Sequence, residues 1–310
     1  MKLGLVGYGA IARGQHEPAL AETDGIELVA LADPAAGHDW LPVYPTLAAM
    51  LNAHPEISAV SLCQPPIARY AAACEAIAAG RHVMLEKPPA ATLAEAESLA
   101  RLAKSAGVTL FAAWHSRAAA AVASAKEWLG QTSLRSAGIV WKEDVRHWHP
   151  GQQWVWNEGG FGVFDPGINA LSILTEILSG RIDLTAAHLE VPANCATPIG
   201  ARLEMTGPGG CPVEAEFDWR QTGPQTWDIV CKTDKGSLVL SGGGNRMAID
   251  GVDQPVGPER EYRVLYRRFA ELVARGESDA DFEPLRLAEE ALVGGIPSST
   301  EPFIERAGEA

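Results

Sequence analysis

Residues 3–12 read Leu3-Gly4-Leu5-Val6-Gly7-Tyr8-Gly9-Ala10-Ile11-Ala12, an apolar run that leads straight into a glycine turn. The run predicts a buried strand, and residues 11–20 predict a helix directly after the turn. Gly7 permits a tight turn, Gly9 lets the backbone approach a pyrophosphate, and Ala12 allows close packing of the helix on the strand. The N–H groups at the start of the helix then face the phosphates. The stretch therefore predicts a dinucleotide-binding unit.

Asp33 ends the second predicted strand, residues 26–32. At this position a carboxylate accepts hydrogen bonds from the ribose hydroxyls of adenosine and repels a 2′-phosphate. Residues 34–37 contain no Arg, Lys or Ser to hold such a phosphate, so NAD is the preferred cofactor. NADP stays possible because Arg13 is close in sequence. A purely local role for Asp33, as a turn former before Pro34, is the alternative interpretation.

Strands and helices continue to alternate as far as residue 114. Helices are predicted at residues 44–53 and 68–79, and strands at residues 59–63, 81–85 and 109–114. Such alternation predicts a parallel sheet with right-handed crossovers, whose ligands bind beyond the carboxyl ends of the strands. We place the cofactor contacts in the turns after these strands, at Gly7, Gly9, Ala10, Ile11, Asp33, Cys63, Gln64, Pro65, Glu86, Lys87 and His115. A structural role at the sheet edge is an open alternative for His115.

The pattern changes at about residue 135 to strands separated by short turns. These strands are predicted at residues 137–141, 185–191, 201–206, 213–219, 227–233 and 237–240. They favour an open, mostly antiparallel sheet with one free face, which a second copy of the chain would cover in a homo-oligomer. We therefore divide the chain into domains 1–118 and 119–310. Two final helices are predicted, at residues 262–275 and 282–292, and packing of these helices against the first domain is left open. The tail from Gly294 onward is expected to be poorly ordered.

Charge and composition argue against several classes of partner and site. The formal net charge is −14, and no run of Lys or Arg exceeds a pair, so neither nucleic acid nor a membrane is expected as a partner. No apolar stretch approaches the roughly 18 residues that span a membrane, and no signal-peptide core is visible. Five cysteines without a C-x-x-C pair indicate reduced thiols in a cytoplasmic protein. His147 and His149 lie two residues apart without a further ligand cluster, so no metal is expected.

Three motifs together resemble one known family. They are the glycine turn, Glu86-Lys87-Pro88, and Gly159-Gly160-Phe161-Gly162-Val163-Phe164-Asp165-Pro166-Gly167-Ile168-Asn169. In order and spacing the chain resembles the Gfo/Idh/MocA oxidoreductases, named after glucose–fructose oxidoreductase, inositol dehydrogenase and rhizopine catabolism. The resemblance implies an α/β protein with an N-terminal Rossmann domain and a C-terminal α/β domain built on an open, mostly antiparallel sheet. It also implies NAD(P)-dependent oxidation and a cis Lys87–Pro88 peptide.

One position departs from the family, since its D-x-x-x-H pattern ends here in Asn169 rather than histidine. Residues 141–144, Trp-Lys-Glu-Asp, and residues 146–150, Arg-His-Trp-His-Pro, accompany this change. The combination resembles the bacterial aldose 1-dehydrogenases, which oxidise L-arabinose or D-galactose to lactones. Another polyol or inositol dehydrogenase of the family, and a non-catalytic sensor of NAD or sugar, are the alternative functions.

Oxidation at C1 of a sugar requires a hydride acceptor, a group that takes the hydroxyl proton, and contacts that hold the other hydroxyls. Lys87, partly desolvated beside a cationic nicotinamide, is expected to polarise or deprotonate the C1 oxygen, with a solvated surface lysine as the alternative. Asp165 is the candidate base coupled to Lys87, and its alternative is an N-cap before Pro166. Asn169 cannot titrate and is expected to orient a hydroxyl. The expected aldose-binding residues are Lys87, Glu143, Trp148, His149, Asp165, Asn169 and Trp227.

Overall fold

The computed structural model describes residues 1–305. The chain forms two compact units, the first comprising residues 1–115 and 260–282 and the second residues 116–259 and 283–310. The sequence predicted one boundary, after residue 118. In the structure the chain passes between the units three times, because one of the two final helices is grouped with the first unit and the other with the second.

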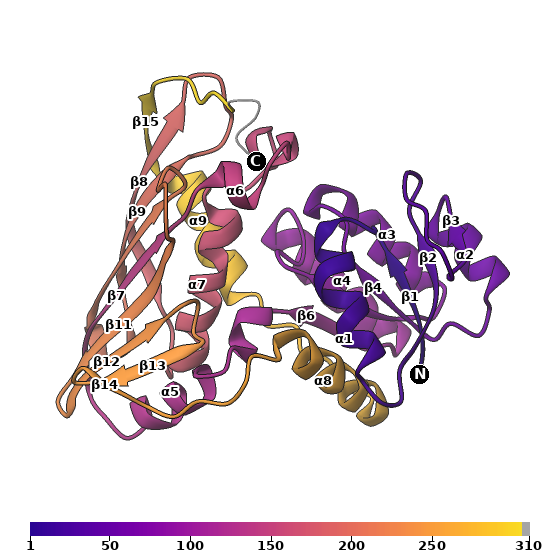
Figure 1. The fold of residues 1–310 in the computed structure, drawn as a ribbon, viewed down its shortest axis with the longest axis horizontal. Coiled ribbons are helices and arrows are strands. Elements are labelled where there is room, and N and C mark those ends of the chain that lie inside the picture. Colours follow the sequence, from indigo (N-terminus) through magenta and orange to yellow (C-terminus); the bar gives the residue numbers. More distant parts are fainter. Residues whose placement is uncertain (306–310) are drawn as a thin grey trace. The chain divides into compact units, whose positions relative to one another are not determined.

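A six-stranded sheet forms the centre of the first unit (Figure 1). Its strands are β1 (Lys2–Val6), β2 (Glu27–Ala32), β3 (Val43–Tyr44), β4 (Ala59–Leu62), β5 (His82–Glu86) and β6 (Leu110–Ala113). Their order is β3-β2-β1-β4-β5-β6, and every neighbouring pair is parallel. The strand order reverses between β1 and β4, which is where a Rossmann sheet binds its ligand. The predicted parallel Rossmann domain is confirmed.

Two apolar layers cover this sheet, one on each face. One layer contains α2, α3 and α4, whose buried side chains pack with Val6, Val60 and Leu85. The other layer contains α1 and α8, which pack with Leu3 and Leu5. The helices are α1 (Glu17–Ala21), α2 (Leu47–Ala53), α3 (Pro66–Ala78), α4 (Leu93–Ala106) and α8 (Glu261–Arg275).

The first helix differs from the single helix predicted for residues 11–20. Residues Ala12–His16 form a wider π-helical turn, and α1 follows with Pro18 in its first turn. Proline has no N–H to donate to the preceding turn, and a π turn is one way in which a helix accommodates such a break. A second difference lies at Tyr44, which was predicted to be helical but belongs to β3, while α2 starts after the N-cap Thr46.

The second unit contains a nine-stranded sheet. Its strands are β7 (Leu134–Lys142), β8 (Asp183–Pro192), β9 (Gly200–Thr206), β10 (Pro212–Asp218), β11 (Thr226–Thr233), β12 (Gly236–Ser241), β13 (Arg246–Ile249), β14 (Val252–Asp253) and β15 (Ile296–Thr300). The order is β14-β13-β12-β11-β7-β10-β9-β8-β15. Within the described residues, neighbours are antiparallel except β7 with β10 and β8 with β15. The predicted open, mostly antiparallel sheet is confirmed.

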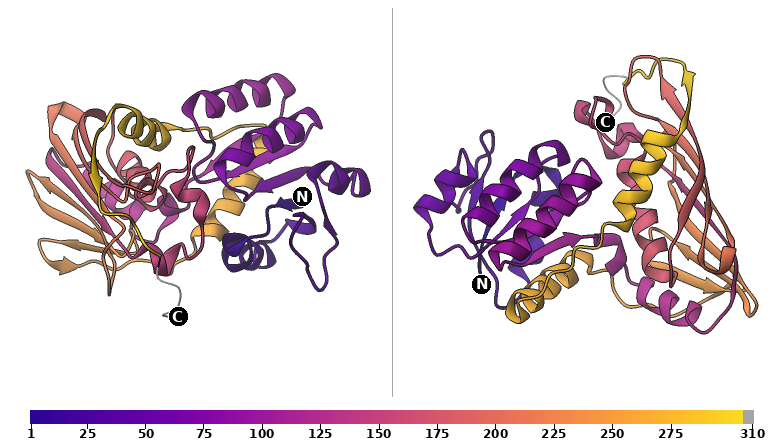
Figure 2. Two further views of the ribbon diagram at one scale, coloured as in Figure 1. Left: turned by 90° about the horizontal axis from the view of Figure 1, so that it is seen from above. Right: turned by 180° about the vertical axis from the view of Figure 1, so that it is seen from behind.

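Helices lie along one face of this sheet, and Figure 2 shows α7 and α9 side by side. The helices of the unit are α5 (Val122–Leu129), α6 (Val145–Trp148), α7 (Phe164–Ile177) and α9 (Glu283–Gly294), with short 3₁₀ turns at residues 115–118, 153–156 and 208–210. Helix α7 approaches the sheet closely at Gly167, where an added Cβ would lie 3.1 Å from the Phe217 ring. The start of α7 is therefore held tightly against the ends of β10 and its neighbours.

The predicted disorder of the tail from Gly294 onward is wrong for its first part. Residues Ile296–Thr300 form β15, which pairs in parallel with β8. The segment is mostly polar and shows no alternation of apolar and polar residues, so its sequence does not predict a strand. It is extended because it pairs with the exposed edge of β8. Residues 306–310 lie outside the described residues.

Candidate active site

The glycine turn follows β1 in the first unit. Gly7 has φ +84°, and an added Cβ would lie 2.7 Å from the backbone nitrogen of Gln64. Glycine is therefore required at this position. At Gly9 an added Cβ would meet nothing within 4 Å, and Ala10 and Ile11 are exposed at the start of the helical segment. The turn thus presents open backbone where a pyrophosphate would have to approach.

Asp33 lies at the end of β2, beside the turn. Its carboxylate accepts hydrogen bonds from the backbone N–H groups of Tyr8 at 2.7 Å, Ala35 at 2.8 Å and Ala36 at 3.0 Å. Partial burial raises the pKa of Asp33, but these donors and the charge of Arg13 outweigh it and hold the pKa below its usual range. Asp33 therefore forms the turn, as the alternative interpretation of the sequence held. Its carboxylate is anionic at neutral pH.

Cys63, Gln64 and Pro65 follow β4, on the other side of β1. The backbone N–H of Cys63 donates a hydrogen bond of 2.7 Å to the backbone oxygen of Val6. The side-chain oxygen Oε1 of Gln64 is buried and has no hydrogen-bond partner among the described residues. A buried acceptor without a donor is rare in native structures, and a bound ligand is one explanation. Together with the open backbone at Gly9, this orphaned oxygen fits a dinucleotide bound at the switch point.

Glu86 ends β5 and is almost completely buried, at 3% exposure. Its Oε2 accepts the backbone N–H of Lys87, and its Oε1 accepts the hydroxyl of Tyr262 at 2.6 Å and lies 3.2 Å from His16 Nε2. Burial by itself raises the pKa of Glu86. The hydrogen bond and the charge of His16 oppose this effect, and the resulting pKa lies far below the ordinary value. Glu86 thus anchors the main chain at Lys87, whose peptide bond to Pro88 is cis as the resemblance implied.

The sequence did not single out His16, Tyr262 or Tyr266 as functional residues. His16 Nδ1 lies 2.7 Å from the hydroxyl of Tyr266, which donates to Ser61 Oγ at 3.1 Å. Burial lowers the pKa of His16, but Cys63, Tyr266 and Glu86 raise it well above its ordinary value. His16 and Glu86 therefore form a buried ion pair.

Arg69 in α3 was also missed. Its side chain is 2% exposed, and its guanidinium donates to the backbone oxygens of Glu86, Pro88 and Gln64. One side chain therefore ties together the turns after β4 and β5. The sequence around Arg69 is rich in alanine and matches no motif that would mark a functional arginine.

His115, a predicted cofactor contact, has partners in α8. Its Nδ1 lies 2.6 Å from Glu261 Oε2, and its ring stacks on Tyr262 with a centroid distance of 5.4 Å. His115 therefore has a structural role at the edge of the sheet, which is the alternative that the sequence left open.

The second unit gathers most of the expected sugar-binding residues around Glu143. This residue follows β7 and is 2% exposed. Its Oε1 accepts the indole N–H of Trp219 at 3.1 Å, and its Oε2 accepts that of Trp227 at 2.8 Å. The carboxylate is thus fixed between two tryptophans, of which the sequence predicted only Trp227 as a contact.

Asp165 and His149 complete the group. His149 Nε2 lies 3.6 Å from Asp165 Oδ2 and 3.9 Å from Glu143 Oε1. Helix α7 starts at Phe164 with Val163 as N-cap, so the alternative that Asp165 is the N-cap is wrong. Asp165 is buried in the first turn, and Asn169 follows one turn later on the same face, where it is partly exposed.

Aromatic rings surround these polar groups. Trp227 stacks on Trp141 at 5.7 Å and meets Trp148, which is 41% exposed, at 5.1 Å. On the other side Trp219 packs at 5.1 Å against His149. Flat apolar rings beside fixed carboxylates suit a ring-shaped ligand that has both CH faces and hydroxyl groups.

A family profile described as "Oxidoreductase family, NAD-binding Rossmann fold" matches residues 1–114. Along the chain, galactose 1-dehydrogenase from Pseudomonas fluorescens is 42% identical over 306 residues, which is 98% of this chain and 99% of that protein. The chain belongs to the Gfo/Idh/MocA oxidoreductase family. As a family member it is an oxidoreductase with an NAD(P)-binding Rossmann domain.

Two solved structures extend the comparison. The D-galactose 1-dehydrogenase from Rhizobium etli has a TM-score of 0.94 and 51% identity, covering 98% of this chain and 97% of that one. A 3-ketoreductase from Actinomadura kijaniata, in complex with NADP and TDP-benzene, shares the fold at 18% identity, with a TM-score of 0.83 and 97% and 99% coverage. No helix among residues 1–305 combines the length and apolar character of a membrane span.

Proposed function

We propose that this oxidoreductase is an NAD-dependent aldose 1-dehydrogenase, which transfers hydride from C1 of a D-galactose- or L-arabinose-type sugar to NAD and forms the aldonolactone. The observation that carries the proposal is the near full-length similarity to two galactose 1-dehydrogenases. The site supports it, because Glu143, His149 and Asp165 offer fixed polar groups beside tryptophan rings.

The first unit is proposed to hold the cofactor, which supplies the hydride acceptor when bound. The open backbone from Gly9 to Ile11 would receive the pyrophosphate, and Asp33 retains lone pairs for the adenosine ribose. Gln64 Oε1 would gain the donor that it lacks.

We assign the catalytic roles to Lys87 and Asp165. Lys87 polarises the C1 oxygen, and Asp165 accepts the hydroxyl proton. Asn169 orients the neighbouring hydroxyl through its amide, while Glu143, Trp148, His149 and Trp227 hold the rest of the sugar.

The decisive experiment measures NADH formation at 340 nm with a panel of aldoses, alditols and inositols. We expect turnover with D-galactose or L-arabinose and none with alditols or inositols. Turnover of an inositol alone would make the chain a cyclitol dehydrogenase instead. No turnover of any donor, together with measurable binding of NAD, would favour a sensor.

Asp33 leads to a prediction about the cofactor. The wild-type protein should have a lower KM for NAD than for NADP, because the anionic carboxylate repels a 2′-phosphate. Replacing Asp33 with serine should shift the ratio of the two KM values toward NADP by about tenfold or more. Asp24→Ser, at an exposed position after α1, is the matched control and should leave the ratio unchanged. A wild-type preference for NADP would refute the assignment.

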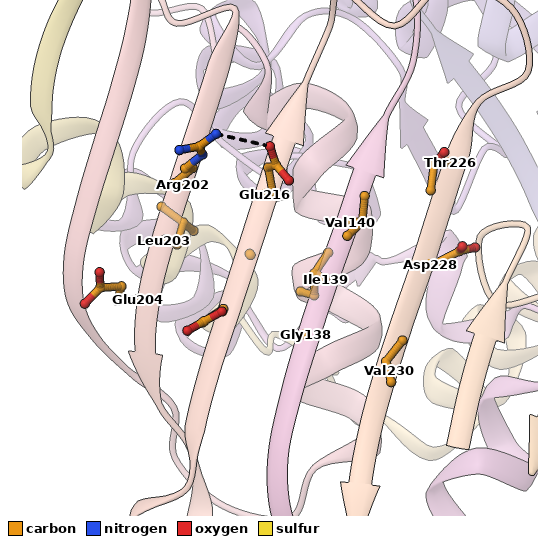
Figure 3. Close-up of a pocket in the computed structure, with 12 residues that line it drawn as sticks. Gly138, Ile139, Val140, Arg202, Leu203, Glu204, Glu216, Thr226, Asp228 and Val230 are labelled. Carbon is orange, nitrogen blue, oxygen red and sulfur yellow. Dashed lines mark ion pairs between the residues drawn. The ribbon is translucent and has the colours of Figure 1, made fainter. Parts of the chain in front are cut away.

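The free face of the nine-stranded sheet is proposed as the contact between copies of the chain. Val140 on β7 is 37% exposed there, and Figure 3 shows Arg202 and Glu216 projecting from the neighbouring strands. Arg202 Nη2 lies 3.6 Å from Glu216 Oε1, and Glu204, Glu214 and Asp228 add acidic groups to the same hollow. A face that carries both signs of charge around apolar side chains can pair with a second copy of itself.

Light scattering after gel filtration tests this contact. The wild-type protein should have at least about twice the 32.9 kDa mass of one chain. Val140→Glu should lower the mass toward that of the monomer, because it buries a charge in the contact. Val252→Glu, at the exposed edge strand β14, is the control. A monomeric wild-type protein, or an unchanged oligomer in Val140→Glu, would exclude this face.

A cytoplasmic location is also proposed. All five cysteines are free thiols in the structure, as expected in a reducing compartment.

A further inference from the structure

The buried carboxylate of Glu86 holds the backbone of Lys87 in the first unit. Its Oε2 accepts the backbone N–H of Lys87, so the direction of the carboxylate helps to fix where the Lys87 main chain lies. Glu86 is only 3% exposed, so its other oxygen must also be bound by groups of the protein. The groups that orient this carboxylate therefore also orient the main chain at Lys87.

Among the described residues, two side chains lie within hydrogen-bond distance of Oε1 of Glu86. The hydroxyl of Tyr262 lies 2.6 Å from this oxygen, whereas Nε2 of His16 lies 3.2 Å from it. The Tyr262 contact has the length of a charge-assisted O–H···O bond, roughly 2.5–2.7 Å, which is a strong and directional bond. The His16 contact is at the long end of the range for an N–H donor. Tyr262, which is 176 residues from Glu86 in the sequence, therefore has the larger part in setting the direction of the carboxylate.

The Tyr262 hydroxyl acts as a donor in this contact. Burial, and after it the charge of Glu86, raise the pKa of Tyr262 well above its ordinary value, so the hydroxyl keeps its proton. Glu86 is ionised, because its pKa lies far below the ordinary value despite its burial. An ionised carboxylate only accepts hydrogen bonds. The bond therefore runs from Tyr262 to Glu86.

The hydrogen bonds of His16 show that its ring carries a positive charge. Nδ1 lies 2.7 Å from the hydroxyl of Tyr266, and that hydroxyl donates its own proton to Ser61 Oγ. The Tyr266 oxygen therefore accepts from Nδ1, and the ionised Glu86 accepts from Nε2, so both ring nitrogens carry protons. This agrees with the pKa of His16, which is raised well above its ordinary value. His16 thus supplies the balancing charge for Glu86, while Tyr262 supplies the closer contact.

The ring of Tyr262 is held by contacts that do not involve its hydroxyl. It stacks on the His115 ring with a centroid distance of 5.4 Å and meets the His16 ring edge to face at 4.7 Å. Tyr262 lies in the first turn of α8 and, like Leu265 on the same helix, belongs to the apolar core of the unit. The hydroxyl is therefore presented to Glu86 by a fixed ring, and removing it leaves these ring contacts in place.

We propose that Tyr262 is a positioning residue for catalysis: its hydroxyl fixes the Glu86 carboxylate, and the carboxylate holds the main chain from which Lys87 reaches the C1 oxygen. The inference rests on the proposed function, in which Lys87 polarises that oxygen. Tyr262 acts through Glu86 and not on the sugar. The proposal gives α8, which the sequence predicted only as an amphipathic helix, a part in the active site.

The first test follows the backbone N–H of Lys87 without cofactor or sugar. The chain has seven lysines, so ¹⁵N-labelled lysine gives a simple NMR spectrum, in which the Lys87 amide is identified by its loss in Lys87→Met. Deuterium exchange of this amide should be slow in the wild-type protein and about tenfold faster in Tyr262→Phe, since exchange requires the hydrogen bond to open. Fast exchange in the wild-type protein overturns the proposal, whether or not the variants fold. An unchanged rate in Tyr262→Phe overturns it as well.

A control variant removes a different tyrosine hydroxyl from the same unit. The hydroxyl of Tyr70 in α3 lies 3.1 Å from Ser98 Oγ in α4. Tyr70→Phe should leave the exchange rate of the Lys87 amide and the turnover at their wild-type values. Equal changes in Tyr70→Phe and Tyr262→Phe would show a general loosening of the unit and contradict the proposal.

A double-mutant cycle tests whether Tyr262 acts through Glu86. Glutamine has a single carbonyl oxygen, so Glu86→Gln cannot accept from Lys87 and from Tyr262 on separate oxygens. In the Glu86→Gln background, Tyr262→Phe should therefore change the exchange rate and kcat by less than about twofold, because the two residues belong to one network. Fully additive effects would mean that Tyr262 does not act through Glu86.

Turnover gives the second measurement. Tyr262→Phe should lower kcat for aldose oxidation by about tenfold with a smaller change in the sugar KM, because a displaced catalytic group loses alignment with the reacting atoms. A hydroxyl with a merely structural role would lower the temperature of unfolding and leave kcat unchanged, and that result would show the proposal to be wrong. Failure of the wild-type protein to oxidise any aldose refutes the proposed function. An unchanged Lys87 amide in Tyr262→Phe refutes this inference even if the protein oxidises galactose.

Discussion

Replacing Lys87 with methionine should lower kcat for aldose oxidation by at least about 100-fold, since positioned proton-transfer groups typically contribute 100- to 10,000-fold. Methionine keeps the length and apolar stem of lysine but has no ammonium group to polarise the C1 oxygen. The fold should survive, because the turn is held through its main chain. Glu86 accepts the backbone N–H of Lys87, and Arg69 binds the carbonyl oxygens on both sides of the residue.

Binding and turnover are measured separately for this variant. NADH titration, followed by quenching of tryptophan fluorescence, should give a dissociation constant close to that of the wild-type protein. Lys104→Met, at an exposed position of α4, controls for the loss of a positive charge from the first unit. If turnover of every aldose by Lys87→Met stays within about threefold of wild type, Lys87 is not catalytic, because losing proton-transfer help costs far more.

Arg69→Met should lower the free energy of unfolding by about 3 kcal/mol, because a buried acceptor that loses its donor costs roughly 1–3 kcal/mol. Three carbonyl oxygens, those of Glu86, Pro88 and Gln64, lose a donor together. The same change loosens the turns after β4 and β5, so the KM for NAD should rise as well. Denaturant unfolding and cofactor kinetics measure the two effects.

The control for Arg69 is an exposed arginine on the next helix. Arg101 in α4 forms an ion pair with Glu97 at 3.8 Å, and both side chains are more than half exposed. Arg101→Met should therefore cost no more than about 1 kcal/mol and leave the KM for NAD unchanged. An Arg69→Met protein as stable as this control would show that Arg69 does not hold the two turns.

Much of the first unit could be predicted because its signals are local. The apolar runs of β1, β4 and β5 and the turns after them identify the parallel sheet and its ligand-binding edge. One local signal was overlooked, however. Thr92 accepts the backbone N–H of Glu95 at the start of α4, the T-x-x-E pattern of a helix start, and Gly107 ends that helix with φ +67°.

The missed site residues depend on contacts between distant parts of the chain. His16 meets Tyr266 across 250 residues of sequence, and Trp219 meets Glu143 across 76. No pattern of propensity or spacing connects such pairs. Arg69 likewise lies in an alanine-rich helix, and its role appears only when two separate turns converge on it.

The glycine turn, the strand-end residues and the family motifs were thus determined by the sequence alone, since each depends on backbone geometry within a few residues. Asp33, Lys87 and Asp165 were predicted as site residues in this way. Tertiary structure decided which side chains surround and hold them. It placed Glu86 against His16, and it brought Nε2 of His149 to 3.6 Å from Asp165 and 3.9 Å from Glu143. Such electrostatic environments arise only when burial removes water and brings remote side chains within a few ångströms.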